Sequence, residues 1–156
     1  MIDSFRGKYR FLSNFYILEY PIFWRGINYP SSEHFYQAMK TTDHDERLLI
    51  SQAKSPGIAK KMCSPEGYKG FKIKLRDNWD IIKDPVMSIG VLIKFTMNIG
   101  LGNMLINTHG QVLIEGNKWC DNYWGDCQCV KCVKHPGLNK LGRILMNTRD
   151  QIINIG

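Results

Sequence analysis

Three polar side chains recur at helical spacing and together could perform acid–base chemistry. Glu33, Gln37 and Lys40 fall within roughly 60° of one another at about 100° per residue, so a helix would place them on one stripe. An acid, an amide and an amine on one rigid element suit a polar site. The same spacing also describes a solvated helix face, which is the more frequent case. Nearby aromatic residues favour a site because they offer a stacking surface: Trp24, Tyr29 and Tyr36.

A second group of reactive side chains lies between residues 115 and 126. Its carboxylates could stabilise an oxocarbenium-like sugar or activate a water molecule, and its aromatic rings could stack on a planar base. A structural loop whose aromatic rings fill the core is equally consistent with this composition. The members are Glu115, Asp121 and Asp126 with Trp119, Tyr123 and Trp124.

The cysteines form a third group. The chain has five, and four of them fall between positions 120 and 132. Thiolate and imidazole ligands at Cys127, Cys129, Cys132 and His135 could hold a structural zinc, although free thiols that order the loop remain the alternative. We expect no catalytic zinc and no cofactor for catalysis. Cys63 lies far from the others and reads as a small buried hydrophobe.

The elements that must position these side chains begin with a hairpin. Residues 22–24 and 27–29 flank an Arg-Gly turn and predict two antiparallel strands, while the rest of the first thirty residues reads as short strands and turns. Pro30-Ser31-Ser32 then predicts a helix start, because serine hydroxyls accept hydrogen bonds from free N–H groups. The helix that would carry the stripe is expected over residues 33–40.

Further apolar periodicity predicts a helix-dominated α+β fold with a small antiparallel sheet. A proline at the first helical position is expected at Ser55-Pro56 and again at Asp84-Pro85. The expected helices cover residues 43–53, 74–83, 84–98 and 138–153. A strand over 112–115 and a loop over 116–137 are expected between the last two of these helices.

Length and composition indicate one domain spanning residues 1–156. No apolar run is long enough for a membrane span, and the first residues lack the apolar segment of a signal peptide, so we expect a cytoplasmic protein. The net charge of +7 and pI of about 9.2 favour nucleic acid or a phosphorylated small molecule as partner, although an evenly solvated basic surface explains the charge equally well. No obligate protein partner is expected.

Two runs of sequence closely resemble the signature of the NADAR or YbiA-like family: residues 5–15, FRGKYRFLSNF, and residues 29–40, YPSSEHFYQAMK. Later landmarks follow in the family's order as far as Arg149, so the resemblance covers nearly the whole chain. They include Ala53-Lys54-Ser55-Pro56, Trp79, Lys94-Phe95, Leu113-Ile114-Glu115, Asp121, Trp124-Gly125 and the run from Gly137 to Gly142.

The resemblance implies an N-glycosidase that cleaves the bond between a ribose and a nitrogen base. It implies Glu33 as the catalytic acid or base, Lys40 as a candidate for a Schiff base with the ring-opened sugar, and Asp121 as the residue that positions sugar hydroxyls or water. It further implies a set of substrate-binding residues: Asn14, Phe15, Tyr36, Gln37, Trp79, Glu115, Trp124 and Asn139. The cysteine group departs from the short glycine-rich stretch that many members carry.

Members of the family are similar in acting on one of two substrate classes. Some remove ADP-ribose from modified guanine in nucleic acid, and the positive charge of this chain favours that class. Others cleave phosphorylated intermediates of the riboflavin pathway. A hypothesis from another class is a non-catalytic module that binds ADP-ribose or nucleic acid through a zinc-held loop.

Overall fold

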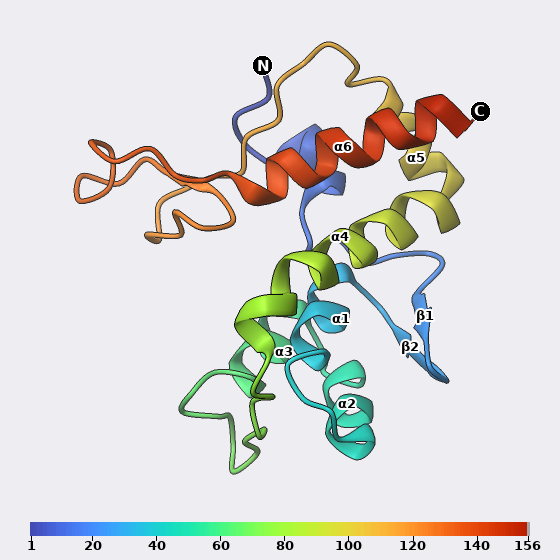
Figure 1. Ribbon diagram of the computed structural model, residues 1–156, viewed down its shortest axis with the longest axis vertical. Helices are drawn as coiled ribbons and strands as arrows, with labels where there is room; N and C mark the ends of the chain where they lie inside the picture. Colours follow the sequence, from blue (N-terminus) through green and yellow to red (C-terminus); the bar gives the residue numbers. More distant parts are fainter. Residues whose placement is uncertain (156) are drawn as a thin grey trace. The chain divides into compact units, whose positions relative to one another are not determined.

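The computed structural model describes residues 1–155 and divides the chain into two compact units. The first unit combines Met1–Ser13 with Ile99–Gly156, and the second consists of Asn14–Asn98. The fold is α+β and rich in helix, with one small antiparallel sheet (Figure 1), so the sequence-based prediction of the fold class is confirmed.

In the second unit, three helices surround a short central one. Helix α1 (Ser32–Ala38) contacts α2 (His44–Ser51), α3 (Pro56–Met62) and α4 (Trp79–Met97), and Figure 1 shows it among them. The antiparallel strands β1 (Ile22–Trp24) and β2 (Ile27–Tyr29) form the predicted hairpin. Arg25 and Gly26 in its turn both have positive φ angles, 47° and 82°, as the tight turns of hairpins require.

Helix α1 begins at a serine cap that also fixes a histidine. The Ser31 hydroxyl accepts a hydrogen bond from the His34 backbone N–H at 3.1 Å and pairs with His34 Nδ1 at 2.7 Å. His34 Nε2 lies 3.0 Å from the Ala53 carbonyl, which can only accept, so Nε2 carries the proton and Nδ1 accepts from Ser31. Burial lowers the pKa of His34, which agrees with this neutral ring.

The apolar side of α1 packs through Phe35. Its ring makes edge-to-face contacts with Trp24 and Tyr29, at centroid distances of 5.8 and 5.6 Å. On α4, Gly90 lies so close that an added Cβ would stand 2.8 Å from Phe35 Cδ1. This close approach holds α1 against α4, and every residue from Ser31 to Met39 is buried.

In the first unit, helix α5 (Ile99–Ile106) packs on α6 (Lys140–Ile155). A 3₁₀ helix occupies Gly7–Leu12, and two short parallel strands, β3 (Gly116–Asn117) and β4 (Asp126–Cys127), lie in the long loop that is orange in Figure 1. Near the N-terminus, Ile2 pairs with Leu113 through hydrogen bonds of 2.8 Å to Val112 O and from Ile114 N.

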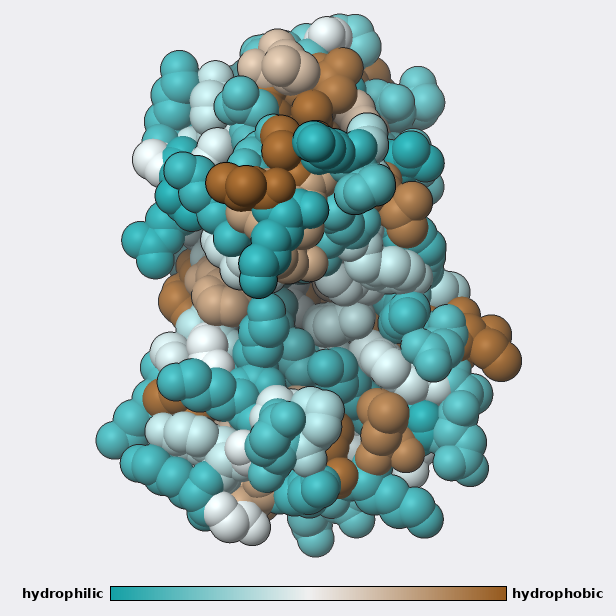
Figure 2. Space-filling model, turned by 90° about the vertical axis from the view of Figure 1, so that its left-hand side faces the viewer, coloured by the Kyte–Doolittle hydropathy of each residue, from teal (hydrophilic) through white to brown (hydrophobic). Residues whose placement is uncertain are grey.

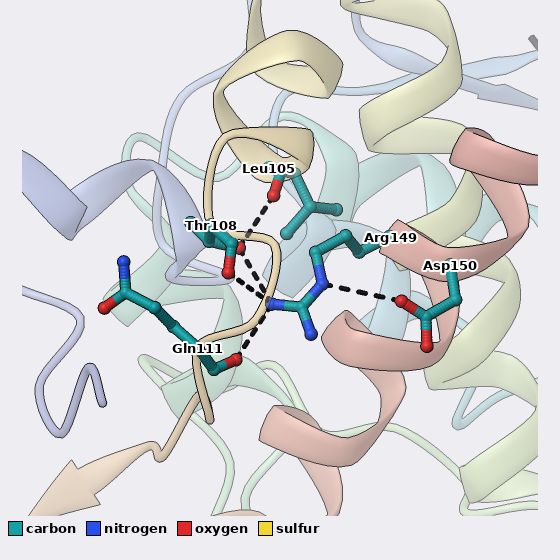
Figure 3. A network of polar contacts seen from close by, with 5 residues as sticks. All are labelled: Leu105, Thr108, Gln111, Arg149 and Asp150. Atoms are coloured by element: carbon teal, nitrogen blue, oxygen red, sulfur yellow. Dashed lines mark hydrogen bonds and ion pairs between the residues drawn. The ribbon is translucent and has the colours of Figure 1, made fainter.

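A buried arginine ties α6 to the turn after α5 (Figure 3). Arg149 Nη1 donates to the carbonyls of Thr108 and Gln111 at 2.7 and 2.9 Å and to Thr108 Oγ1 at 3.1 Å. Its Nε atom forms an ion pair with Asp150 at 3.6 Å. Thr108 Oγ1 in turn donates to the Leu105 carbonyl at 2.7 Å. The guanidinium thereby binds two carbonyls of the turn that follows α5.

The prediction of two separate helices between residues 74 and 98 is wrong. One continuous helix, α4, replaces the two helices expected over 74–83 and 84–98, and Pro85 lies inside it. Proline in a helix interior removes one N–H donor, but burial of the apolar face formed by Met87, Val91 and Phe95 outweighs that loss. Helix α6 confirms the last predicted helix with its start shifted by two residues, from 138 to 140.

Three local predictions fail for related reasons. The strand expected over 112–115 reduces to the single pair at Leu113, and residues 7–12 are a 3₁₀ helix where strands and turns were expected. Helix α5 was not expected, because Gly100 and Gly102 weaken the helical pattern. In each case, tertiary contacts rather than local propensity select the structure.

Apolar side chains also reach the surface. On the face drawn in Figure 2, hydrophobic residues (brown) lie in separate groups among hydrophilic ones (teal). Within residues 1–155, no single helix is long and apolar enough to cross a lipid bilayer, although α4 and α5 counted together across their break would satisfy the same length and composition.

Candidate functional site

The second unit buries a carboxylate and an amide side by side on α1. Glu33 and Gln37 are only 6% and 3% exposed, and Gln37 Nε2 donates to Glu33 Oε1 at 2.7 Å. The Glu33 backbone N–H donates to the Asn14 carbonyl at 3.0 Å, which fixes the start of the helix. The first two members of the predicted stripe therefore lie on α1 and face the interior, which is not the solvated face that the same spacing allowed.

Lys40, predicted as the last residue of this helix, lies in the turn two residues beyond its end at Ala38. Burial is the main cause that lowers its pKa, while the charge of Glu33 partly raises it again. The Lys40 ammonium nitrogen lies 5.8 Å from the centroid of the Tyr36 ring. A lysine in such an environment holds a larger fraction of neutral amine than an exposed lysine at the same pH.

Two predicted substrate-binding residues pack against each other here. Tyr36, the ring that lies near the Lys40 nitrogen, contacts Trp79 with ring centroids 5.1 Å apart and a tilt of 58°. Cys63 also lies near the Lys40 amine, although the sequence predicted only a small buried hydrophobe at this position. It is buried as predicted, and burial raises the pKa of its thiol to about 12, so the thiol stays protonated.

Buried polar atoms around α1 lack a hydrogen-bond partner. Among the described residues these include Asn14 Oδ1, Ser32 Oγ and Gln37 Oε1. The Asn14 amide nitrogen donates to Met87 Sδ at 3.1 Å, whereas its Oδ1 atom has no hydrogen-bond partner. A buried polar atom without a partner costs about 1–3 kcal/mol, and such atoms are common where a ligand supplies the missing hydrogen bonds.

Phe15, predicted to line the substrate pocket, is 40% exposed and lies near Gly57 of α3. Lys94 on α4, named from the sequence only as a family landmark, is a buried lysine. It is 1% exposed, and burial lowers its pKa to about 7. Its nitrogen lies 4.9 Å from the Phe95 ring and 5.7 Å from the Tyr16 ring. The position of this lysine among the buried apolar residues of α4 was the signal in the sequence that could have indicated its burial.

In the first unit, Asn117 organises the loop that carries Asp121. Asn117 is 2% exposed, and its Nδ2 donates to the Asp121 carbonyl at 2.7 Å and to Glu115 Oε2 at 3.4 Å. Asp121 Oδ1 accepts from the backbone N–H groups of Tyr123 and Trp124 at 3.1 and 2.9 Å. One carboxylate oxygen of Asp121 thus shapes the turn that presents Trp124.

Glu115 and Asn139 lie at the base of the same loop. Asn139 adopts a positive φ of 47°; its Oδ1 accepts from Glu115 N and its Nδ2 donates to Leu113 O, both at 2.9 Å. The Glu115 carboxylate lies against Gly125, where an added Cβ would be 2.0 Å from Oε2. The Asn139 amide therefore has a structural role that the sequence did not reveal, and substrate contact by it stays a prediction.

The cysteine group gathers with a different fourth member than the sequence predicted. The sulfur atoms of Cys120, Cys127, Cys129 and Cys132 all lie within 4.8 Å of one another, whereas the imidazole of His135 is not part of the cluster. Hydrogen bonds from the Cys127 and Cys120 thiols lower the pKa of Cys129 to about 6. Such a donor set can hold a metal ion.

The predicted site residues thus form two groups, one in each unit. The second unit brings together Glu33, Gln37, Lys40, Tyr36 and Trp79, with Asn14 at the start of α1. The first unit links Glu115, Asp121, Trp124 and Asn139 through the hydrogen bonds of its loop.

Comparisons with known proteins show the family of this chain. The family model described as NADAR domain matches residues 4–153. The N-glycosidase YbiA of Shigella boydii serotype 4 is 35% identical over 149 residues, covering 96% of this chain and 85% of the relative. The chloroplastic riboflavin biosynthesis protein PYRR of Zea mays is 35% identical over 133 residues, which are 81% of this chain but 20% of that protein.

A solved structure is similar as well. The NMR structure of the Escherichia coli protein YbiA matches with a TM-score of 0.77 and 31% identity, covering 99% of this chain and 88% of the other. The protein is accordingly an enzyme, a hydrolase that acts on N-glycosidic bonds. It belongs to the NADAR domain family, as the match over residues 4–153 shows.

Proposed function

We propose that this N-glycosidase removes ADP-ribose from modified guanine in nucleic acid. The observation that carries the proposed chemistry is the buried pair of Glu33 and Gln37, followed by Lys40 with its lowered pKa. The net charge of +7 supports a polyanionic substrate, because a positive protein attracts nucleic acid.

Glu33 is proposed as the acid or base that assists departure of the guanine. Cleavage breaks the bond between ribose C1 and the base nitrogen; the base nitrogen gains a proton and C1 gains the oxygen of water. The 2.7 Å hydrogen bond from Gln37 holds the carboxylate in one orientation, and burial strengthens its effect on a developing positive charge at the ribose. General acid–base catalysis of this kind contributes about 10²–10⁴-fold to a rate.

Lys40 is proposed as a transient nucleophile. Opening of the ribose breaks the bond from C1 to the ring oxygen, which takes a proton, and leaves C1 doubly bonded to the base nitrogen. The neutral Lys40 nitrogen would then add to C1, and the base would leave with the electrons of its bond to C1 and a proton, so that C1 becomes doubly bonded to the Lys40 nitrogen. Water would later add to C1, and the amine would depart as the sugar is released. This route needs the unprotonated amine, and the lowered pKa of Lys40 supports it. Tyr36, whose ring lies near this amine, is proposed to line the pocket, and Trp79, which packs on Tyr36, is proposed to stack on the base or the ribose.

The remaining substrate roles stay with the residues named from the sequence. Asn14 and Gln37 have buried oxygen atoms without a partner, and substrate hydroxyl or amino groups would satisfy them. Asp121 is proposed to position sugar hydroxyls or water through its carboxylate, and Trp124 to contribute a stacking surface. Phe15, Glu115 and Asn139 complete the proposed binding set.

A second candidate substrate is a phosphorylated intermediate of the riboflavin pathway. The names of relatives favour it: besides the maize protein, a Vibrio vulnificus relative that is 32% identical over 142 residues is called riboflavin biosynthesis protein VVA0006. Both substrates share a phosphorylated ribose on a nitrogen atom, so the same chemistry serves either.

The proposed function also includes the domain, cofactor, compartment and partners of the enzyme. We propose that residues 1–156 act as one NADAR domain, that catalysis needs no cofactor, and that the enzyme works in the cytoplasm without an obligate protein partner. All five cysteines are free thiols, which suits a reducing compartment.

The test compares both substrates with three proteins. The wild type, Glu33→Gln and the matched control Glu66→Gln, which changes an exposed acid of the second unit, each receive an oligonucleotide with ADP-ribose on guanine and a phosphorylated riboflavin intermediate. We expect release of ADP-ribose from the oligonucleotide, a loss of about 10²–10⁴-fold in Glu33→Gln, and an unchanged rate in the control.

Other outcomes separate the alternatives. Cleavage of the riboflavin intermediate alone would replace the proposed substrate by the second candidate. Binding of ADP-ribose without cleavage of either compound would favour the non-catalytic module. Full activity of a folded Glu33→Gln variant would remove Glu33 from the mechanism.

A further inference from the structure

The loop between β3 and α6 gathers four sulfur atoms in the arrangement that a metal ion needs. We propose that Cys120, Cys127, Cys129 and Cys132 bind one zinc ion. Zinc at about 2.3 Å from four thiolates places the sulfurs roughly 3.8 Å apart. Here all four lie within 4.8 Å of one another, and Cys120 and Cys129 are 3.5 Å apart, so small side-chain movements close the site.

The backbone around Cys127 fixes the position of its sulfur. The sulfur accepts hydrogen bonds from the backbone N–H groups of Cys120 at 3.2 Å and Cys129 at 3.4 Å. Bonds of this kind orient a metal ligand. Cys127 is also completely buried, and the other three sulfur atoms lie within 4.8 Å of its own.

Turns on both sides bring the other ligands into place. The backbone N–H groups of Cys132 and Val133 both donate to the Cys129 carbonyl at 2.9 Å, which closes the turn between two ligands. Cys120 has a positive φ of 64°, a conformation that costs a residue with a side chain about 1–2 kcal/mol. A bond from its sulfur to a shared ion would offset that strain.

Asn122 joins the two sides of the loop through backbone groups and leaves the four sulfur atoms available to the ion. Its Oδ1 accepts from Cys127 N at 2.8 Å and its Nδ2 donates to the His135 carbonyl at 3.2 Å. His135 thus contributes its backbone here, and the fourth ligand is Cys120.

The ligand type selects the ion. Four soft thiolates in a tetrahedral set are typical of zinc or iron, and zinc is the usual occupant of structural four-cysteine sites. Such a site carries a net charge of about −2, and the exposed residues Lys118, Lys131 and Lys134 follow or flank its ligands in the sequence. Their charges would partly offset the negative site.

Metal binding would also affect the loop that carries Asp121. Cys120 precedes Asp121, so an ion that joins Cys120 to Cys127, Cys129 and Cys132 fixes one end of the turn to Trp124. This consequence for catalysis rests on the proposed function, whereas the binding of zinc does not.

The experiment measures metal in the full-length protein, purified under reducing conditions without chelator. We expect about one zinc per chain in the wild type. Variants distinguish Cys120 from His135 as the fourth ligand. We expect Cys120→Ser to lose most of its zinc, while His135→Ala and the control Cys63→Ser keep theirs. Thermal unfolding should show a lower Tm for Cys120→Ser and for chelator-treated wild type.

Opposite results overturn the proposal. They are a wild type without bound zinc that also takes up no cobalt(II), iron in place of zinc, or zinc kept by Cys120→Ser but lost by His135→Ala. If Cys120→Ser does not fold, alkylation of the wild type decides: the four clustered thiols should react only after chelator is added. Equal reactivity with and without chelator would contradict metal binding, whatever the enzyme's activity.

Discussion

Helix α1 and the loop from Gly116 to Gly137 both collect polar side chains, but they hold them by different means. On α1, Glu33 and Gln37 are fixed by burial within packed helices. In the loop, Asp121 is half-buried and fixed by hydrogen bonds to Asn117 and to the backbone N–H groups of its own turn.

The difference indicates a division of roles. A buried helix with few exposed atoms keeps a carboxylate in a low-dielectric environment, where its charge acts strongly on a substrate. A loop without an apolar core of its own needs cross-links, and the first unit provides Asn117, Asn139 and the clustered cysteines. We therefore expect changes on α1 to affect mainly the rate of reaction and changes in the loop to affect mainly stability.

The largest effect is expected at Lys40. Lys40→Met should lower kcat by about 10²-fold or more, because it removes the amine, while Tm changes little at this half-buried position. Borohydride added during turnover should trap the wild-type enzyme and its sugar as a covalent adduct, detected by mass spectrometry. Because only the neutral amine reacts, the rate should rise with pH up to the lowered pKa of Lys40.

The exposed Lys61 on α3 provides the control, and Lys61→Met should leave both rate and Tm unchanged. Absence of the adduct, together with a Lys40→Arg variant that retains full activity, would rule out covalent catalysis by Lys40.

A smaller effect, on stability, is expected at the base of the loop. Asn139→Ala should lower the free energy of unfolding by about 2–4 kcal/mol, because two hydrogen bonds to the backbone are lost and alanine enters a left-handed conformation at φ 47°. Urea unfolding measures the change. Asn147→Ala, at an exposed position of α6, should change stability by less than about 0.5 kcal/mol.

If both asparagine variants unfold alike, the loop is not held by Asn139. If Asn139→Ala instead keeps its stability and raises KM, the residue binds substrate and the contrast between loop and helix weakens.

The smallest effect concerns Lys94, whose pKa of about 7 lies below the ordinary 10.5. The unfolded chain then binds more protons than the folded one between these two values, so stability should rise with pH in that range. From about pH 7 to 8.5 the gain should be roughly 1.5 kcal/mol. Above the ordinary thiol pKa of 9.0 the trend is opposed by Cys63, whose pKa of about 12 keeps its folded form protonated.

Thermal unfolding of the wild type and Lys94→Met at both pH values measures this contribution. The variant should lack the Lys94 part of the pH dependence, whereas Lys74→Met, at an exposed position, should behave as the wild type. An identical pH dependence in wild type and Lys94→Met would show that Lys94 is not the titrating group.

Local signals in the sequence were sufficient for the start of α1 and for its stripe. Ser31 is a cap that needs only the following N–H groups, and helical spacing aligns Glu33 with Gln37 wherever the helix lies. The hairpin turn at Arg25 and Gly26 is similarly local, since positive φ angles are required within the turn itself.

The cysteine cluster marks the limit of such reasoning. Spacing favoured His135 as the fourth ligand because it follows Cys132 closely, but the folded loop, in which Asn122 Oδ1 accepts from Cys127 N, brings Cys120 to the other sulfurs. Only a folded loop can reveal that Cys120 is close. The continuous helix through Pro85 is a similar case, because packing outweighed a local stop signal.

The sequence by itself determined the helix-dominated α+β fold, the NADAR family and the residues able to do acid–base chemistry, since these depend on periodicity, caps and motifs along the chain. The tertiary structure decided that α1 is buried, that Lys40 has a lowered pKa and that Cys120 joins the sulfur cluster. Burial and proximity arise from contacts between distant segments, and no pattern within one segment encodes them.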